Sequence, residues 1–392
     1  MHILYGFSNC TDKKYNELMD GTSFAILRPD QKYHGLLIKG LCENKAELKC
    51  FSGLPVNREL TKKIFIHEKD ETENGVYYHY IGTLNLPFFR RLSIFFGSFF
   101  GVLTAKRYAD SCIVCDCLNI SNSYGMMLAG KIKKIPVVTI VTDIPDMISG
   151  GSIKRRINNN FFKSVDGFVL LTKQMNRRVN LKAKPYIVLE GHVDASLPAP
   201  ESNEKAENKA GIKQIIYAGS VKEMYGIKNL VDGFILANLD DSELIIYGDG
   251  DYADELRKIS AQYPSVKYMG VCENSEVVAA EQSAALLVNP RPVAPEYTKY
   301  SFPSKNMEYM VSGTPVLTTR LPGMPEEYYP YVYLLDDETP IGISDKLREI
   351  FALSPEQRNE FGGKAREFVL KNKSNVTQAK RIINFLESEI IR

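Results

Sequence analysis

The chain has 392 residues, of which 44% are hydrophobic and 24% are charged, with a formal net charge of +2. This length exceeds one typical domain, so two domains of comparable size are expected. The near-neutral charge argues against general nucleic-acid binding, which needs a concentrated basic excess. No stretch of about 18 apolar residues lacks charge, so no membrane span is expected.

The N-terminus, MHILY, predicts a strand and not a signal peptide. Seven cysteines leave one unpaired in any disulfide scheme, and reduced, cytoplasmic conditions are therefore expected. Three of them, Cys112, Cys115 and Cys117, lie in SCIVCDCL, where strand alternation points Cys112 away from the other two. This is poor metal geometry, so core thiols are favoured over a metal site. Neither a metal nor another cofactor is expected.

The first half of the chain alternates apolar strands with helices. The expected strands are MHILYGF, ELKCFSGL, KKIFIHE, VYYHYIG, SCIVCDCL, IPVVTIVTD and VDGFVLLT. The expected helices are QKYHGLLIKGLCEN, a segment around Gly125 to Ala129, and a segment through Met175 and Val179. This alternation predicts a largely parallel sheet covered on both faces, with ligands at the carboxyl ends of the strands.

A polar stretch, LPAPESNEKAENKAGIK, separates the two halves and reads as a linker. The alternation then resumes with QIIYAGS, ELIIYGD, VKYMGV, AALLVNP and TPVLTT, and with helices near 229–238 and 254–261. We expect a first domain over 1–196, a linker over 197–212, a second domain over 213–373, and a C-terminal amphipathic helix over 374–392 that packs back on the first domain. The predicted fold class is α/β, with two Rossmann-like doubly wound domains facing across a cleft that holds the chemistry.

The stretch YSFPSKNMEYMVSGTPV, from Tyr300 to Val316, carries the densest local signal. It predicts a Pro-Ser-Lys turn, a helix with Met307 and Met310 facing a core, a stop at Gly313 and a buried strand. Helix-start amides, Lys305 and Glu308 would lie within about one helical turn, a set suited to the phosphates and ribose of a nucleotide diphosphate. The competing interpretation is an ordinary helix end followed by a buried strand of an α/β fold, with Glu308 exposed to solvent.

Five segments of the second half occur in a recognisable order: YAGSVKEMYGIKNLVDGF, IIYGDGDYADEL, VKYMGV, LLVNPR and SFPSKNMEYMVSGTPVL. Together they resemble the donor-binding domain of retaining nucleotide-sugar glycosyltransferases of family four (glycosyl transferases group 1), which have the GT-B architecture. The ordered resemblance extends over about 100 residues, and no single segment would be specific alone. The first half resembles the family only in outline, through its strand–helix rhythm, IPVVTIVTD, and VLEGHVD near the hinge.

The resemblance implies that the domain over 1–196 binds the acceptor and that the domain over 213–373 binds the nucleotide-sugar donor. It also implies roles for individual residues of the second half. Gly219 and Ser220 would form the loop that approaches the donor diphosphate, and Gly248 and Gly250 the turn near the base. Small residues permit such close backbone approach. Glu308 matches the second glutamate of the family's paired-glutamate motif and would bind ribose hydroxyls.

Three positions depart from the family pattern: Tyr300 stands in place of the first glutamate, Ser220 of an arginine and Tyr225 of a lysine. Positive charge for the diphosphate would then come from neighbouring cations. These are Lys222, Arg291 and Lys305, the last in the turn with Pro303 and Ser304.

In the first half, Asp143 follows the apolar strand PVVTIV, and a strand-end carboxylate could orient an acceptor hydroxyl or cap the next helix. Asp143, Lys305 and Arg291 are the expected catalytic residues. The residues Gly6, Phe7, Ser8 and Asn9 would form a loop near the acceptor or the donor phosphates. His192, near the hinge, is interpreted as structural.

The segment from Leu86 to Leu103, LPFFRRLSIFFGSFFGVL, is strongly aromatic and contains Arg90 and Arg91. Together with the basic run Lys154 to Arg156, it predicts contact with a membrane surface. The alternative is a core helix in which Gly97 and Gly101 allow close packing.

The sequence therefore predicts a retaining glycosyltransferase that uses a nucleotide diphosphate sugar, with a UDP-sugar favoured. Its acceptor would be a glycan or a lipid-linked hydroxyl in cell-surface polysaccharide or glycolipid synthesis, with no nucleic-acid partner. The expected location is cytoplasmic, with peripheral contact at the inner face of the cell membrane. A non-catalytic nucleotide-sugar-binding partner subunit is the alternative, and a nucleotide-sugar epimerase is a weaker one because no acid–base set for it is found.

Overall fold

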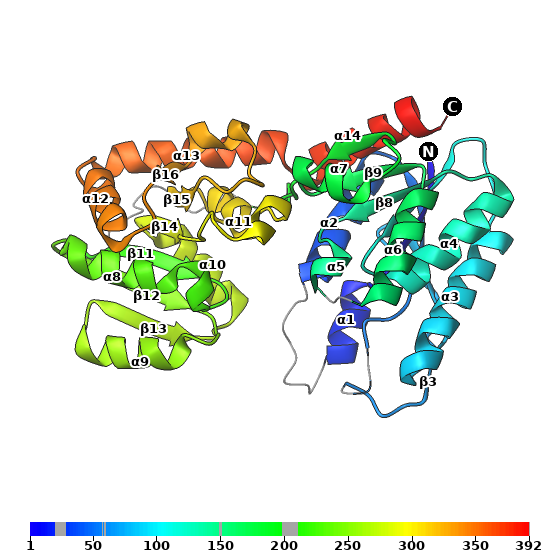
Figure 1. Ribbon diagram of the computed structural model, residues 1–392, viewed down its shortest axis with the longest axis horizontal. Helices are drawn as coiled ribbons and strands as arrows, with labels where there is room; N and C mark the ends of the chain where they lie inside the picture. Colours follow the sequence, from blue (N-terminus) through cyan, green and yellow to red (C-terminus); the bar gives the residue numbers. More distant parts are fainter. Residues whose placement is uncertain (20–28, 57, 59, 149–150, 198–210, 392) are drawn as a thin grey trace. The chain divides into compact units, whose positions relative to one another are not determined.

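The computed structural model describes residues 1–19, 29–56, 58, 60–148, 151–197 and 211–391. They form two units (Figure 1): unit 1 contains Met1–His192 and Ser374–Arg392, and unit 2 contains Val193–Lys373. Most of the predicted linker, 198–210, lies outside the described residues.

Unit 1 is built on an eight-stranded sheet in the order β10-β9-β8-β7-β1-β2-β5-β4. All neighbouring strands are parallel except β4, which runs antiparallel to β5. The strands are β1 (His2–Phe7), β2 (Glu47–Ser52), β4 (Glu71–Glu73), β5 (Val76–Tyr80), β7 (Ser111–Asp116), β8 (Val137–Val141), β9 (Gly167–Leu170) and β10 (Tyr186–Val188). Because β1 pairs with both β2 and β7, the strand order reverses at β1. That reversal marks the expected ligand position of such a sheet.

Helices cover both faces of this sheet. They are α1 (Asp12–Met19), α2 (Pro29–Glu43), α3 (Pro87–Thr104), α4 (Ile120–Lys133), α5 (Pro145–Ile148), α6 (Ser152–Ser164), α7 (Lys173–Val179) and α14 (Asn375–Phe385). On one face, Leu37 of α2 and Ile382 of α14 share a core with Tyr5 and Phe7 of β1. On the other face, Gly6 lies against α4, where an added Cβ would meet Met126 Sδ at 2.1 Å. Strand alternation at β1 thus directs each face to its own helix layer.

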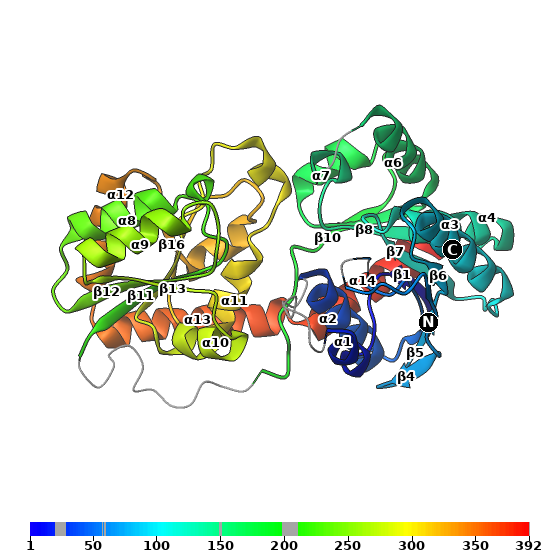
Figure 2. The ribbon, with the colours of Figure 1, turned by 90° about the horizontal axis from the view of Figure 1, so that it is seen from below.

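The C-terminal helix α14 belongs to unit 1 although unit 2 precedes it in the chain, and it lies beside α2 (Figure 2). Asn375 Nδ2 donates to Leu36 O at 3.1 Å, and Gln378 Nε2 donates to Gly191 O at 2.8 Å. A Cβ on Gly40 would lie 2.2 Å from Asn375 O, so only glycine allows this approach of the two helices. A short π-helical turn, Leu386–Ile390, follows α14.

The predicted strand KKIFIHE is only partly realised. Its two strand residues, β3 (Phe65–Ile66), pair antiparallel with β6 (Thr83–Leu84) in a separate two-stranded sheet. Its apolar residues therefore do not extend the main sheet, and Phe65 is 59% exposed.

Unit 2 contains a six-stranded parallel sheet in the order β13-β12-β11-β14-β15-β16. Its strands are β11 (Lys213–Ala218), β12 (Ser242–Tyr247), β13 (Val266–Gly270), β14 (Leu286–Asn289), β15 (Val316–Thr319) and β16 (Tyr333–Leu335). The strand order reverses between β11 and β14, the order typical of a Rossmann sheet.

The helices of unit 2 are α8 (Ile227–Ala237), α9 (Ala253–Gln262), α10 (Asn274–Ser283), α11 (Ser304–Ser312), α12 (Pro340–Phe351) and α13 (Pro355–Asn372). Two short 3₁₀ turns in the described part of this unit, Glu223–Tyr225 and Glu296–Tyr300, lie between a strand and a helix, and a third, Glu326–Tyr331, lies between β15 and β16. The predicted stop of α11 is confirmed, because Gly313 caps it in the left-handed conformation at φ 77°. Met307 and Met310 are buried, as the helical spacing predicts.

Helix α3 presents two different faces. Gly97 packs against Ile81 and Gly101 against Phe51, the close packing that the core-helix alternative predicts. The opposite side exposes an aromatic stripe, defined here as Phe88, Leu92, Phe96 and Phe100 at four-residue spacing, with exposures of 67, 37, 49 and 56%. Over the part of the chain that the structure describes, no helix has the length and apolar character needed to cross a bilayer.

Candidate functional site

At the strand-order reversal of unit 2, two glycine turns pack backbone against backbone. Gly248 has φ +119°, and a Cβ there would lie 1.8 Å from Gly219 O. A Cβ on Gly250 would lie 2.0 Å from Val221 O. The two predicted donor turns thus require glycine at 248 and 250 because they pack against each other, which is a structural reason that the sequence alone did not reveal.

A cluster of cations and tyrosines lies beside these turns. The Arg291 guanidinium carbon is 4.7 Å from the centroid of the Tyr225 ring, and Lys222 Nζ is 5.9 Å from the same centroid. Tyr225, which stands in place of the family's lysine, therefore contacts two cations through its π system. Arg291 Nε and the Tyr297 hydroxyl are buried and have no hydrogen-bond partner among the described residues. A buried guanidinium N–H without an acceptor is suited to an anionic ligand.

The backbone of Arg291 is fixed by the next strand, because Thr319 Oγ1 donates to Arg291 O at 2.6 Å. The side chain therefore projects from a restrained segment at the carboxyl end of β14. Loops of this kind, held by a rigid sheet, commonly carry binding residues.

On α11 the two predicted donor contacts, Lys305 and Glu308, bind each other. Lys305 Nζ lies 2.8 Å from Glu308 Oε2 and 3.8 Å from Oε1 of Glu281, which belongs to α10. Burial alone would lower the pKa of Lys305, but the charges of Glu308 and Glu281 outweigh it and raise the pKa above its usual value. Lys305 is thus a paired cation in the ligand-free protein, and two carboxylates face it.

Helix α11 is fastened to the strand ends by buried polar groups. The Tyr309 hydroxyl accepts from Ala218 N at 2.8 Å and donates to Ala218 O at 3.1 Å, next to Gly219. Asn306 accepts from Asn289 Nδ2 at 2.7 Å and donates to Thr318 Oγ1 at 3.1 Å. These bonds join α11 to the ends of β11, β14 and β15.

The remaining residues considered for the donor site lie at the start of α11, in the turn before it and below the turn at Ser220. Pro303 is the N-cap of α11 and makes no side-chain capping bond, and Ser304 is the exposed first residue of the helix. Tyr300 ends the 3₁₀ turn Glu296–Tyr300 before α11 begins. Tyr217 lies below the turn, and its hydroxyl donates to the carbonyl of Ser220 at 2.8 Å.

In unit 1, the structure corrects the extent of the predicted loop Gly6 to Asn9. Gly6 and Phe7 belong to β1, where Phe7 is fully buried, because the apolar strand continues through both. Asn9 is also buried, and its amide donates to Gln31 O at 3.4 Å. Only Ser8 is partly exposed, and its hydroxyl donates to Gly53 O at 2.7 Å. Of the four residues, Ser8 is thus the one with a surface open to a ligand.

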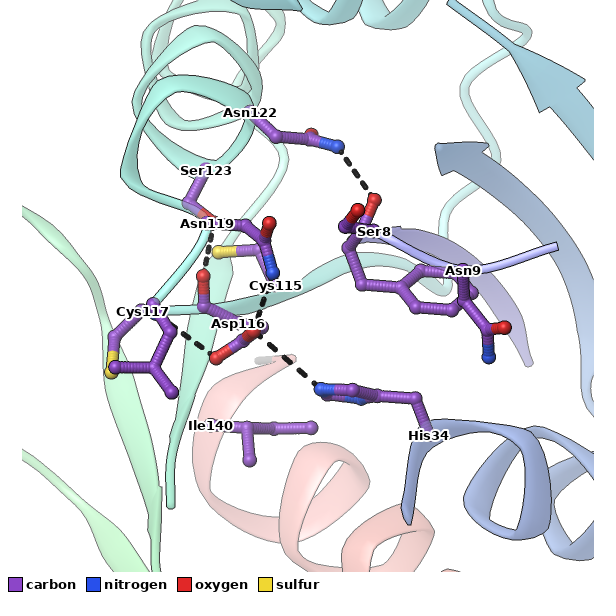
Figure 3. Close-up of polar contacts among 12 residues, drawn as sticks. Ser8, Asn9, His34, Cys115, Asp116, Cys117, Asn119, Asn122, Ser123 and Ile140 are labelled. Carbon is purple, nitrogen blue, oxygen red and sulfur yellow. Dashed lines mark hydrogen bonds and ion pairs between the residues drawn. The ribbon is translucent and has the colours of Figure 1, made fainter. Parts of the chain in front are cut away.

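A buried polar chain that sequence reasoning missed lies under the strand-order reversal of unit 1. Asp116 Oδ2 is 3.6 Å from His34 Nε2 (Figure 3). His34 Nδ1 is hydrogen-bonded to the Tyr5 hydroxyl at 2.8 Å. Asp116 also accepts from Leu118 N at 3.0 Å and Asn119 Nδ2 at 2.6 Å. Burial and nearby negative charges, including that of Asp116, hold the pKa of Tyr5 well above its usual value, so the phenol stays protonated.

Asp143 lies just past the end of β8, and the residue is exposed. Desolvation by the surrounding protein, followed by the charge of Asp116, raises the pKa of Asp143 from 3.8 to about 6. An exposed carboxylate that titrates near neutral pH at a strand end is a candidate for proton or hydroxyl chemistry.

His192 has the opposite character. Its Nε2 lies 2.8 Å from Tyr33 O, and burial lowers the pKa to about 4. The ring is therefore neutral at physiological pH, in agreement with its interpretation as structural.

The cysteines of SCIVCDCL are buried thiols. Cys112 Sγ faces Pro136 O, Cys115 Sγ faces Val138 O and Cys117 Sγ faces Asp143 O. Burial raises the pKa of all three above the usual value, so they remain protonated.

Comparison with known proteins agrees with this architecture. The family described as Glycosyl transferases group 1 matches residues 199–368, most of unit 2. A sequence search of the curated proteins finds no match. The sucrose-phosphate synthase of Thermosynechococcus elongatus is 13% identical, with a TM-score of 0.66, and the match covers 99% of this chain and 98% of that one.

Two further solved structures are similar over their full lengths. HepE from Anabaena, solved with UDP, is 15% identical over 99% of this chain and 100% of its own, with a TM-score of 0.65. The trehalose-6-phosphate protein of E. coli, bound with UDP-2-fluoro glucose, is 9% identical over 99% of both chains, also with a TM-score of 0.65. The fold of this protein is GT-B, and within it the group 1 glycosyltransferase family matches residues 199–368.

Proposed function

We propose that this protein transfers a sugar from a nucleotide diphosphate sugar, with a UDP-sugar favoured, to a hydroxyl acceptor in cell-surface polysaccharide or glycolipid synthesis. The observation that carries the proposal is the buried, unpartnered Nε of Arg291 beside the glycine turns at the strand-order reversal of unit 2. HepE and the E. coli protein were solved with UDP or a UDP-sugar analogue, which supports a uridine nucleotide as the donor.

In this proposal the donor diphosphate binds the turn at Gly219 and Ser220, with Arg291 and Lys222 near its negative charge. When the sugar is transferred, the leaving diphosphate gains charge, and Arg291 stabilises it from a fixed position. Glu308 accepts hydrogen bonds from ribose hydroxyls, and Lys305 exchanges part of its contact with Glu308 for a phosphate oxygen. The Tyr225 ring keeps both cations at the site in place of the family's lysine.

The acceptor is proposed to bind unit 1 near Ser8 and Asp143, where the Asp143 carboxylate orients the attacking hydroxyl. Retention of the anomeric configuration is part of the proposal and rests on the family resemblance. No metal takes part in this scheme, because protein cations neutralise the diphosphate.

Contact with a membrane surface is proposed for the aromatic stripe of α3 together with the exposed cation Arg91. The arginine beside it, Arg90, is less available, because its Nη2 donates to Leu54 O at 3.0 Å. Aromatic side chains on one side of a helix, with basic residues at its end, are typical of helices that lie in a bilayer interface. A lipid-linked acceptor would be reached from that position.

The test is release of nucleotide diphosphate from a panel of nucleotide sugars by the purified protein, with and without membranes. Replacing Arg291 by Gln should lower kcat by about 10²–10³, the usual effect of removing one charge-stabilising donor. Replacing Glu308 by Gln should weaken donor binding about tenfold, because a hydrogen bond to a charged group contributes about 1.5–3 kcal/mol. Breaking its ion pair with the 39% exposed Lys305 should cost stability under about 1 kcal/mol.

Glu349→Gln, on α12 and 66% exposed, is the matched carboxylate control and should leave donor binding unchanged. If donor binds but no nucleotide diphosphate is released under any condition, the non-catalytic partner subunit replaces the enzyme. The departures at Ser220, Tyr225 and Tyr300 motivate that alternative.

A further inference from the structure

Helix α6 of unit 1 carries a basic surface that the proposed transfer reaction does not use. A shallow pocket of about 380 Å³ runs along it and is lined by Ser152, Arg155, Arg156, Asn159, Asn160 and Lys163. These residues recur at helical spacing and form one side of α6. The lining contains three cations, two amides, one hydroxyl and no carboxylate.

A second pocket of about 220 Å³ adjoins the first, since both are lined by Arg155 and Asn159. Its remaining lining comes from the α5 region, α6 and α7, with Arg178 and Asp146 as the charged groups and Phe162 and Val179 among the apolar ones. We call the two pockets together the α6 basic pocket. It offers guanidinium and ammonium groups around a partly apolar floor.

The charges of the α6 basic pocket are poorly balanced. Asp146 lies 3.7 Å from Arg155 Nε and also accepts from Asn158 Nδ2 at 3.2 Å. Arg156, Lys163 and Arg178 form no ion pair within the described residues. Four cations against one carboxylate leave a formal excess of +3, whereas the whole chain carries only +2. A concentrated excess of this kind attracts a multivalent anion.

The position of the cations on α6 strengthens this argument. Arg155 and Arg156 lie near the helix N-terminus, whose first turn contains no acidic residue. Cations at that end oppose the helix dipole, so this arrangement is unfavourable for the free helix. An anion bound in the α6 basic pocket would offset both the dipole and the mutual repulsion of the cations.

We propose that the α6 basic pocket binds a phosphate group, and specifically a phosphomonoester or pyrophosphate. Three arginines provide planar forks that match two phosphate oxygens each. A carboxylate ligand carries one negative charge and would leave most of the excess unbalanced. The donor diphosphate is assigned to unit 2, so this phosphate belongs to a second ligand, either a soluble phosphorylated acceptor or the headgroup of a lipid.

The test is a calorimetric titration of the full chain with inorganic pyrophosphate at constant ionic strength. The double variant Arg155→Gln/Arg178→Gln should lose a binding component that the wild type shows, with its affinity reduced at least about tenfold as two charged contacts disappear. A second variant, Arg156→Gln/Lys163→Gln, removes exposed cations from the other part of the pocket and should weaken the same component. Thermal unfolding of each variant checks that the fold is intact.

Arg177→Gln is the matched control, because Arg177 is exposed on α7 beside Arg178 but lines neither pocket. Equal titrations for the wild type and both double variants, or an equal loss in Arg177→Gln, would overturn the proposal. Arg291→Gln should retain this component even if the proposed transferase function fails, so the two proposals are tested separately.

Vesicles distinguish the source of the phosphate. If phosphatidylcholine vesicles containing phosphatidic acid displace pyrophosphate from the wild type but pure phosphatidylcholine vesicles do not, the ligand is a lipid headgroup. If neither displaces it while a soluble sugar phosphate does, the ligand is a soluble phosphate ester. If a single-stranded oligonucleotide displaces pyrophosphate, while neither the vesicles nor the sugar phosphate does, the pocket binds nucleic acid and the proposal is wrong.

Discussion

At the scale of single residues, the pKa values of groups near the strand ends depend on neighbours that are distant in sequence. Asp143 and Asp116 are the clearest pair, because the charge of Asp116 adds to desolvation in raising the pKa of Asp143 to about 6. Asp116 itself is buried with His34. The carboxyl group at 143 therefore changes its charge near pH 6.

We predict that transferase activity falls as pH drops through about 6, because Asp143 orients the acceptor as a carboxylate and becomes neutral below that pH. Asp143→Asn should be less active at neutral pH and should lack this acidic limb. The measurement is the pH dependence of kcat/KM for both proteins. Asp345→Asn, on α12 and 68% exposed, is the control and should keep the wild-type profile.

Ionisation of Asp143 also changes the free energy of unfolding, in a direction that follows from its raised pKa. Its pKa is higher in the folded protein than the ordinary 3.8, so the folded state holds the proton more tightly. The ionised carboxylate therefore destabilises the fold above pH 6, and this penalty declines as the pH falls from about 6 to 3.8. Asp143→Asn should exceed the wild type in free energy of unfolding at pH 7.5 and by less at pH 4.5, and an equal advantage at both pH values would contradict this origin.

Sequence reasoning predicted the local structure of the proposed donor site where its residues lay in one local pattern. The turn, helix, glycine stop and strand from Pro303 to Leu317 follow from spacing and from the left-handed preference of glycine, and the structure confirms them. The pairing of Lys305 with Glu308 could also be read from the i, i+3 spacing. The approach of Glu281 could not, because it depends on how α10 packs beside α11.

The chain Tyr5, His34 and Asp116 had no sequence signal for a similar reason. Its members come from β1, α2 and β7, and they meet only because β1 and β7 are neighbours in the sheet. Periodicity predicted each element but not the order of the strands. Gly6 and Phe7 were assigned to a loop because the point where an apolar strand ends is not encoded sharply in apolar residues.

At the scale of elements, α3 combines both interpretations that its sequence allowed. Its glycines seat it against Ile81 and Phe51, while the aromatic stripe remains exposed. We propose that the exposed aromatic stripe is the part of α3 that contacts another apolar phase, as contiguous exposed apolar patches commonly do.

We predict that Phe96→Ser/Phe100→Ser reduces binding to vesicles that contain anionic lipid, and that Arg91→Glu reduces it further. Each phenylalanine would lose about 1.5–3 kcal/mol of burial if it inserted fully, so a loss of at least tenfold is expected. Cosedimentation with vesicles measures the effect. Ile341→Ser, which removes an isolated 64% exposed side chain of unit 2, is the control, and equal losses in both proteins would contradict a specific role for the stripe.

At the scale of the whole molecule, each unit has its own sheet and core, but unit 1 is completed by a distant part of the chain. Ala379, Ile382, Phe385 and Leu386 are buried in the core of unit 1 with residues of α2. The chain therefore passes between the units twice, at His192–Val193 and at Lys373–Ser374.

We predict that truncation after Lys373 destabilises unit 1 far more than unit 2. Removing the three large buried side chains Ile382, Phe385 and Leu386 should cost about 4.5–9 kcal/mol by burial alone, comparable to the entire stability of a domain. Limited proteolysis should cut the truncated protein within Met1–His192 first and leave Val193–Lys373 protected. Equal protection of both units would show that α14 is dispensable.

This return of the chain also sets the order of events during synthesis. Unit 2 is continuous in sequence, so all of its residues have been made before α14 leaves the ribosome. Unit 1 begins first, but its core lacks Ala379, Ile382, Phe385 and Leu386 until residues after Lys373 have been made. The domain made first is therefore the domain finished last, and the nascent N-terminal half is the part that a chaperone would need to shield.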